Sequence, residues 1–153
     1  VRRLVFLKPC NASWLQDLPA GIQEMVIHRR VELAGGASYR WPRNLLKLSL
    51  PESYAGPIHG DRWPRGLERL TQLRLSSYNL PLAGVTWWQQ LEVLHLGVAF
   101  DRTLEGVQWP PRLRSLNMSR LFQQPLAGVE LPPRLQDLDL GGRWNCTLAG
   151  VAW

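Results

Sequence analysis

The sequence predicts a right-handed repeat solenoid, built mostly of short parallel β-strands joined by turns and irregular segments, with little α-helix. A unit of about 22 residues recurs through the 153-residue chain, and such a regular period is typical of stacked coils. Proline at the second position of most units prevents a helix from continuing through that corner. Parallel strands joined by crossovers coil right-handed in nearly all proteins. The units open at Leu18, Trp41, Trp63, Trp87, Trp109, Leu131 and Trp153.

One short strand is expected in each unit, at the end of the apolar spacing Leu-x-x-Leu-x-Leu. The last two apolar positions alternate with polar ones, which is the period of a strand with one buried face. Residues 1 to 18 fit a degenerate first coil that carries Leu4 and Phe6. In the later units the inward pairs are Met25 and Ile27, Leu48 and Leu50, Leu73 and Leu75, Leu94 and Leu96, Leu116 and Met118, and Leu138 and Leu140.

The segment after each strand repeats an aromatic residue, a polar residue, an apolar residue and a glycine. In one unit these are Tyr78, Asn79, Leu82 and Gly84. Equivalent positions of stacked coils become ladders, so we expect the aromatic residues in the core and the glycine at a positive φ or a close backbone approach. A polar side chain in such a turn can hydrogen-bond backbone groups of its own coil and of the neighbouring one. In the later units this polar ladder comprises Asn79, Asp101, Gln123 and Asn145.

The Leu-x-x-Leu-x-Leu spacing resembles the leucine-rich repeat, and the segment after it resembles the FNIP repeat, a leucine-rich-repeat relative named for Phe-Asn-Ile-Pro. The closest copies are residues 78–82, Tyr-Asn-Leu-Pro-Leu, and residues 122–126, Phe-Gln-Gln-Pro-Leu. Residues 100–103 and 144–147 lack the proline, and Ala55 stands at the polar position of an earlier copy. The resemblance covers the chain from about Leu4 to Trp153. It implies an array that binds other proteins.

The repeats account for nearly the whole length, so we expect residues 1–153 to form a single repeat domain. The chain opens in the middle of a unit and closes on the first residue of another, and we therefore expect a fragment of a longer array. The expected units are a partial one at 1–17 and full ones at 18–40, 41–62, 63–86, 87–108, 109–130 and 131–152.

The outward-pointing strand positions form the concave surface, which is normally the binding face of such an array. We call it the strand face. These positions vary in charge from unit to unit, whereas the inward ladders hardly vary, which is the pattern of a recognition surface and also of a solvated one. We predict a non-enzymatic scaffold that binds a protein partner here. The predicted contact residues are Lys47, Gln72, Arg74, Val93, His95, Ser115, Asn117, Asp137 and Asp139.

Catalytic, metal and cofactor chemistry is not predicted. Asp137 and Asp139 point the same way, but His95 lies two coils away, roughly 10 Å along the stack, too far for a hydrogen-bonded acid-base set. The three histidines fall in different columns and the cysteines at opposite ends, so no metal site is predicted. Every recurrent glycine is solitary, so no phosphate loop is predicted. No apolar run approaches the roughly 18 residues of a membrane span, and no small-molecule substrate is suggested.

Polyanion or nucleic-acid binding is the alternative. The net charge is +6, and residues 1–76 hold all of the excess, with two lysines and ten arginines against six acids. Cations beside aromatic residues can grip phosphates and stack on bases. Corner arginines can equally keep an apolar solenoid soluble. The recurrent corner arginines are Arg43, Arg65, Arg112 and Arg134, and Trp14 and Trp88 are the tryptophans expected to be exposed anchors.

An intracellular location is favoured, although the compartment is otherwise unknown. Cys10 and Cys146 lie six coils apart, about 29 Å at the strand spacing, so they cannot form a disulfide within the molecule. Unpaired cysteines favour a reducing compartment. Three glycosylation sequons begin at Asn11, Asn117 and Asn145, and we interpret Asn11 and Asn145 as structural members of the polar ladder.

Overall fold

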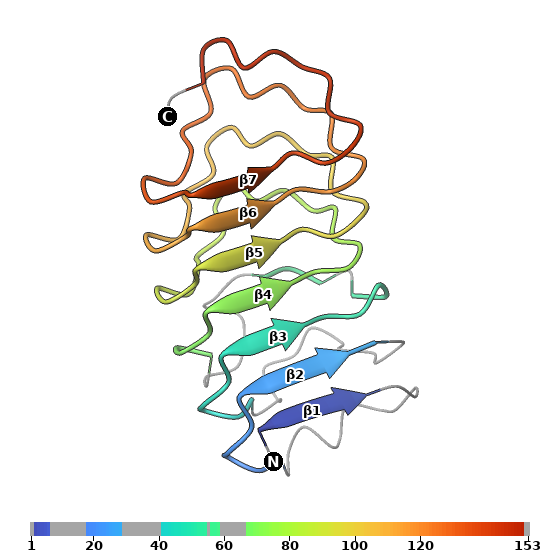
Figure 1. Cartoon of the computed structure of the whole chain (residues 1–153), viewed down its shortest axis with the longest axis vertical. Helices are drawn as coiled ribbons and strands as arrows, with labels where there is room; N and C mark the ends of the chain where they lie inside the picture. The colour runs from blue at the N-terminus through green and yellow to red at the C-terminus, as the bar shows by residue number, and fades with distance from the viewer. Residues whose placement is uncertain (1, 7–17, 29–40, 55, 59–66, 152–153) are drawn as a thin grey trace.

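In the computed structural model the chain is a stack of coils, each contributing one short strand to a continuous sheet (Figure 1). The structure describes residues 2–6, 18–28, 41–54, 56–58 and 67–151. Within these ranges there is no helix, and hence no helix able to cross a membrane. The strands are β1 (Arg3–Phe6), β2 (Glu24–Ile27), β3 (Lys47–Ser49), β4 (Gln72–Arg74), β5 (Val93–His95), β6 (Ser115–Asn117) and β7 (Asp137–Asp139).

All seven strands are parallel and follow one another across the sheet in chain order. In Figure 1 the strands run in front from left to right, the chain returns behind them, and each coil lies above the previous one, so the coil is right-handed. The solenoid class, the parallel strands and the near absence of helix are as the sequence predicts.

The register between strands turns single positions into straight columns on the strand face. Each strand pairs with the next residue for residue, as in Lys47 opposite Gln72 and Ser49 opposite Arg74. The first column is Arg3, Glu24, Lys47, Gln72, Val93, Ser115 and Asp137. The second column is Val5, Val26, Ser49, Arg74, His95, Asn117 and Asp139.

The inward strand residues form the core, together with aromatic ladders behind the sheet. Leu94 and Leu116 are completely buried between β4 and β7. Behind them Phe100 and Phe122 stack with ring centroids 6.1 Å apart. At the corner of the coils Trp87 and Trp109 stack at 6.5 Å. Offset stacking of this kind adds to the stabilisation that burial alone provides.

Trp88 is buried in this corner, so the prediction that it is an exposed anchor is wrong. It occupies the second position of its unit, where Pro42, Pro110 and Pro132 are also buried. Its backbone carbonyl accepts a hydrogen bond from the Leu91 amide, as the Pro110 carbonyl does from the corresponding amide one coil later. The indole therefore takes the place of a core proline ring.

The polar ladder joins adjacent coils in the middle of the stack. The Asn79 side chain accepts a hydrogen bond from the Asp101 amide at 3.0 Å, and Asp101 accepts one from the Gln123 amide at 2.9 Å. Asn145, expected to be internal, is instead exposed in the last coil, because no described coil lies beyond it. There the Cys146 thiol donates to the Gln123 carbonyl.

The recurrent glycines have the positive φ that the repeat predicts, between 70° and 77° at Gly84, Gly106, Gly128 and Gly150. Several other residues singled out in the sequence lie outside the described residues. These are Cys10, Asn11, Trp14, Ala55, Trp63, Arg65 and Trp153.

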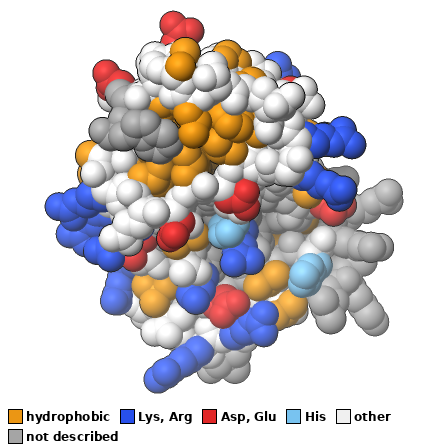
Figure 2. All heavy atoms as spheres, turned by 45° about the horizontal axis from the view of Figure 1, so that its top comes forward, with side chains coloured by type: hydrophobic (Ala, Val, Ile, Leu, Met, Phe, Trp, Pro, Cys, Tyr) orange, Lys and Arg blue, Asp and Glu red, His pale blue; other side chains and the backbone are white. Residues whose placement is uncertain are grey.

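The C-terminal coil leaves its apolar face partly open. Leu138 is half-buried where the equivalent Leu116 is completely buried, and Leu148 is 45% exposed where Leu126 is fully covered. Figure 2 shows hydrophobic side chains gathered at this end of the stack. Apolar burial in a solenoid comes from both neighbouring coils, and β7 has only β6 beside it in the sheet order.

Candidate functional site

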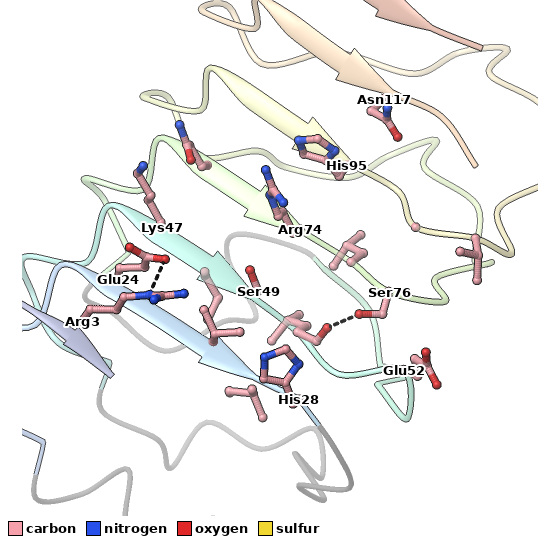
Figure 3. Close-up of a pocket in the computed structure, with 18 residues that line it drawn as sticks. Arg3, Glu24, His28, Lys47, Ser49, Glu52, Arg74, Ser76, His95 and Asn117 are labelled. Atoms are coloured by element: carbon pink, nitrogen blue, oxygen red, sulfur yellow. Dashed lines mark hydrogen bonds and ion pairs between the residues drawn. The ribbon is translucent and has the colours of Figure 1, made fainter. Parts of the chain in front are cut away.

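The strand face is hollowed into an open groove of about 660 Å³, which lies across β1 to β6 (Figure 3). That volume is within the range of protein ligand sites. Members of both columns from β1 to β6 line the groove, together with the turns that follow β2, β3, β4 and β5. Its charged and polar lining residues are Arg3, Glu24, His28, Lys47, Ser49, Glu52, Gln72, Arg74, Ser76, His95 and Asn117.

An ion pair lies at the end of the groove formed by β1 and β2. The Arg3 guanidinium lies 3.0 Å from the Glu24 carboxylate, across β1 and β2 in the first column. Both side chains are partly exposed, so the pair contributes little to stability. Its consequence for the groove is that the charge of Arg3 is already matched within the protein.

The middle of the groove holds two cationic side chains that, unlike Arg3, are not ion-paired within the described residues. Lys47 on β3 and Arg74 on β4 are both exposed, and neither has an ion-pair partner among the residues that the structure describes. They lie on adjacent strands, one in each column, which places their backbones roughly 8 Å apart at ordinary strand spacing and rise. In Figure 3 both side chains rise from the strands on the groove side of the sheet.

His95 is the neighbour of Arg74 in the second column. Burial lowers the pKa of its imidazole, and the charge of Arg74 lowers that pKa further; Asp139 and a hydrogen bond with the Asn117 side chain act in the opposite direction. Because the lowering causes dominate, the ring is neutral at neutral pH. A neutral imidazole at the edge of a cationic site can gain a proton when an anion arrives.

A chain of hydrogen bonds connects His95 to the acidic end of the strand face. The Asn117 side-chain amide donates to the Asp139 carboxylate at 2.6 Å, and the other oxygen of Asp139 accepts from the Gly141 amide at 2.9 Å. Asp137 lies beside it in the first column and is exposed. The strand face is therefore two-signed, with cations at β3 and β4 and carboxylates at β7.

The predicted contact residues all lie on this face, but the groove gathers only some of them. The predicted contact residues that line the groove are Lys47, Gln72, Arg74, His95 and Asn117. On the strand face beyond it are Val93, Ser115, Asp137 and Asp139.

Sequence reasoning missed the groove residues that follow the strands, among them His28, Glu52 and Ser76. The signal that could have found them is their position one to three residues after a strand, where the chain turns away at the rim of the sheet. The Ser76 hydroxyl donates to the Leu50 carbonyl at 2.7 Å, which fixes one such turn against the preceding coil.

The corner arginines lie elsewhere. Arg43, Arg112 and Arg134 do not line the groove, and Arg112 and Arg134 line a separate shallow cleft of about 320 Å³ with Gln89 and Gln90. The Arg112 guanidinium donates to the Gln90 side chain at 2.6 Å, and this hydrogen bond fixes the cation against the preceding coil.

Metal-ligating side chains are not clustered in the part of the chain that the structure describes. Within the described ranges no three histidine, cysteine, aspartate or glutamate side chains are grouped as a metal site requires. Among the described residues, no serine of the groove is hydrogen-bonded to His28 or His95, and the Ser76 hydroxyl donates instead to the Leu50 carbonyl.

Comparison with known proteins bears on the fold. No protein-family model matches the sequence, and no curated protein matches it. Among solved structures the chain is similar to CroV588, described as a novel circular LRR protein, with a TM-score of 0.76 and 17% sequence identity. The match covers 96% of this chain and 21% of that one. The chain therefore has a leucine-rich-repeat-like fold.

Proposed function

We propose that this chain is a non-enzymatic scaffold that binds a partner protein on its strand face. The observation that carries the proposal is the two-signed strand face, on which Lys47 and Arg74 lack ion-pair partners among the described residues and line an open groove. A regular stack holds such charges at fixed spacing, and complementary charge gives an interface its specificity and register. The FNIP character of the repeats belongs to the same proposal and is supported by residues 78–82 and 122–126.

A charge-swapped variant tests the proposal without altering net charge. In Lys47→Glu with Asp137→Lys, a cation of the groove and a carboxylate of β7 exchange signs. Both side chains are exposed, so the fold should tolerate the change. The matched control is Glu130→Lys with Arg134→Glu, an exposed pair that does not line the groove. Affinity capture from a cell extract should lose its protein partner with the first variant and keep it with the second. Equal capture by both would contradict binding on the strand face.

Polyanion binding remains the second candidate function because the chain carries a net charge of +6 and a cleft with two corner arginines. Phosphate contacts release counterions, so this mode predicts affinity that falls steeply with salt and depends little on sequence. The same capture experiment separates the two candidates when it is repeated with nuclease and at two salt concentrations. Capture that disappears with nuclease and is insensitive to the strand-face swap would favour the polyanion.

A further inference from the structure

We infer that the groove binds an acidic side chain of an extended partner segment between Lys47, Arg74 and His95, and that a basic residue of the same segment, about four positions away, meets Asp137 and Asp139. The inference rests on the proposed function and names the chemistry of the partner. The cations at β3 and β4 and the carboxylates at β7 match the two ends of such a segment.

The acidic subsite follows from the cations of the groove. Arg3 is matched by Glu24, whereas Lys47 and Arg74 have no such partner in the described part of the chain. The remaining carboxylate of the groove, Glu52, lies on the turn after β3, apart from both cations in Figure 3. A carboxylate placed over β3 and β4 would thus meet two cations at once, and Arg74 offers it a bidentate fork.

The spacing to the basic subsite follows from the strand register. Three strand steps separate Arg74 on β4 from Asp139 on β7, which is roughly 14 Å at the usual spacing of neighbouring strands. An extended peptide rises about 3.3 Å per residue, so four residues cover that distance. The second column between these ends offers His95 and Asn117, both half-buried, as polar contacts for the intervening backbone.

The mixed signs favour a peptide over a nucleic acid. A phosphate backbone carries uniform negative charge, and a strand laid along the columns from β3 would reach the carboxylates of Asp137 and Asp139. A segment with one acidic and one basic residue matches both ends. The corner arginines, which could serve a polyanion, do not line this groove.

His95 provides a readout inside the site. The charged and titratable groups that act on it are Arg74 from β4 and Asp139 from β7, with the Asn117 side chain between. In the free protein its pKa is lowered, chiefly by burial and then by Arg74. A carboxylate beside Arg74 favours the protonated ring and so raises that pKa. Binding should therefore take up a proton and strengthen as the pH falls through the range in which histidine titrates.

The experiment uses the whole chain and the peptide Glu-Glu-Ser-Ser-Lys-Lys, in which the two acidic and the two basic residues are centred four positions apart. NMR follows the His95 ring during titration, which detects weak binding. We expect the peptide to raise the pKa of His95 and to bind at least about threefold more tightly at about pH 6 than at about pH 8. The peptide Gln-Gln-Ser-Ser-Lys-Lys should leave that pKa unchanged.

Two variants and a second anion complete the test. Lys47→Gln with Arg74→Gln should weaken peptide binding about fivefold, whereas Arg43→Gln with Arg134→Gln, an equal loss of charge outside the groove, should not. Equal effects of the two variants, or an unmoved His95 pKa, would overturn the inference. Tighter binding of inorganic triphosphate, lost in the same groove variant, would overturn it in favour of a phosphate ligand. If partner capture still depends on the Lys47 and Asp137 swap while His95 does not respond, the inference fails and the proposed function stands.

Discussion

Replacement of Gly97 by alanine should destabilise the solenoid much more than replacement of Gly106, although both glycines have a positive φ. Gly97 follows β5 with φ of 84°, and a Cβ atom built on it would overlap the backbone carbonyls of Leu75 and Ser76 in the preceding coil. Gly106 has φ of 70°, and a Cβ atom there would meet nothing within 4 Å. The two sites share the backbone strain and differ in the overlap.

The expected magnitudes follow from that difference. A non-glycine residue in the left-handed region costs about 1–2 kcal/mol, and both variants incur this cost. At Gly97 the overlapping atoms are backbone atoms, which cannot rotate away, and forcing extra atoms into a packed site adds about 1–3 kcal/mol. We therefore expect a loss of about 1 kcal/mol for Gly106→Ala and about 3 kcal/mol for Gly97→Ala.

Urea denaturation followed by tryptophan fluorescence measures this difference, because Trp87 and Trp109 stack in the core of adjoining coils. With a denaturant slope of about 2 kcal/mol per molar, the extra 2 kcal/mol moves the midpoint by about 1 M. Equal midpoints for the two alanine variants would refute the close approach of Gly97 to the preceding coil. The groove would then have a different floor, since Gly97 is one of its lining residues.

Three further outcomes follow from the stack. Leu116→Ala should lower the free energy of unfolding by about 3 kcal/mol and Leu138→Ala by about 1 kcal/mol, because the first side chain is fully buried and the second only partly. Denaturation midpoints of the two variants measure this difference. Equal losses of stability would contradict an open terminal coil. Burial raises the pKa of Tyr78 from 10.0 to about 12, so its contribution to stability is complete below pH 10 and is lost as the pH rises through 12. The Tyr78→Phe variant should lack that alkaline loss in unfolding midpoints taken across this range, and an identical alkaline loss would refute the assignment. Asp101→Ala should lower the free energy of unfolding by about 1 kcal/mol, because the Gln123 backbone amide loses its hydrogen-bond acceptor. Asp101→Asn keeps an acceptor oxygen and should retain most of that stability. Denaturation of both variants decides whether the acceptor or the charge matters.

Part of the candidate site could be predicted because the register of a solenoid is contained in its repeat. Side chains alternate across a strand, and a unit of constant length brings the same position back in each coil. Lys47, Arg74, His95 and Asp137 could therefore be assigned to the strand face from their spacing alone, and their columns are those observed. What they bind stays a prediction.

The rest of the site depends on distances between coils, which no pattern of residues contains. His28, Glu52 and Ser76 enter the groove because the turns after the strands fold back beside the sheet. The lowered pKa of His95 depends on how deeply its ring is buried and on Arg74 one coil away. Both are properties of packing.

The sequence by itself determined the coil, its period and the residues that face inward, since these follow from local spacing and from the exclusion of helix by proline. It could not determine that Trp88 fills a core corner or that Asn145 lies exposed in the last coil. Only the tertiary structure decided those positions and the groove, because burial is a property of what the neighbouring coils cover. A repeat pattern specifies each coil alike, whereas exposure differs between the middle of the stack and its end.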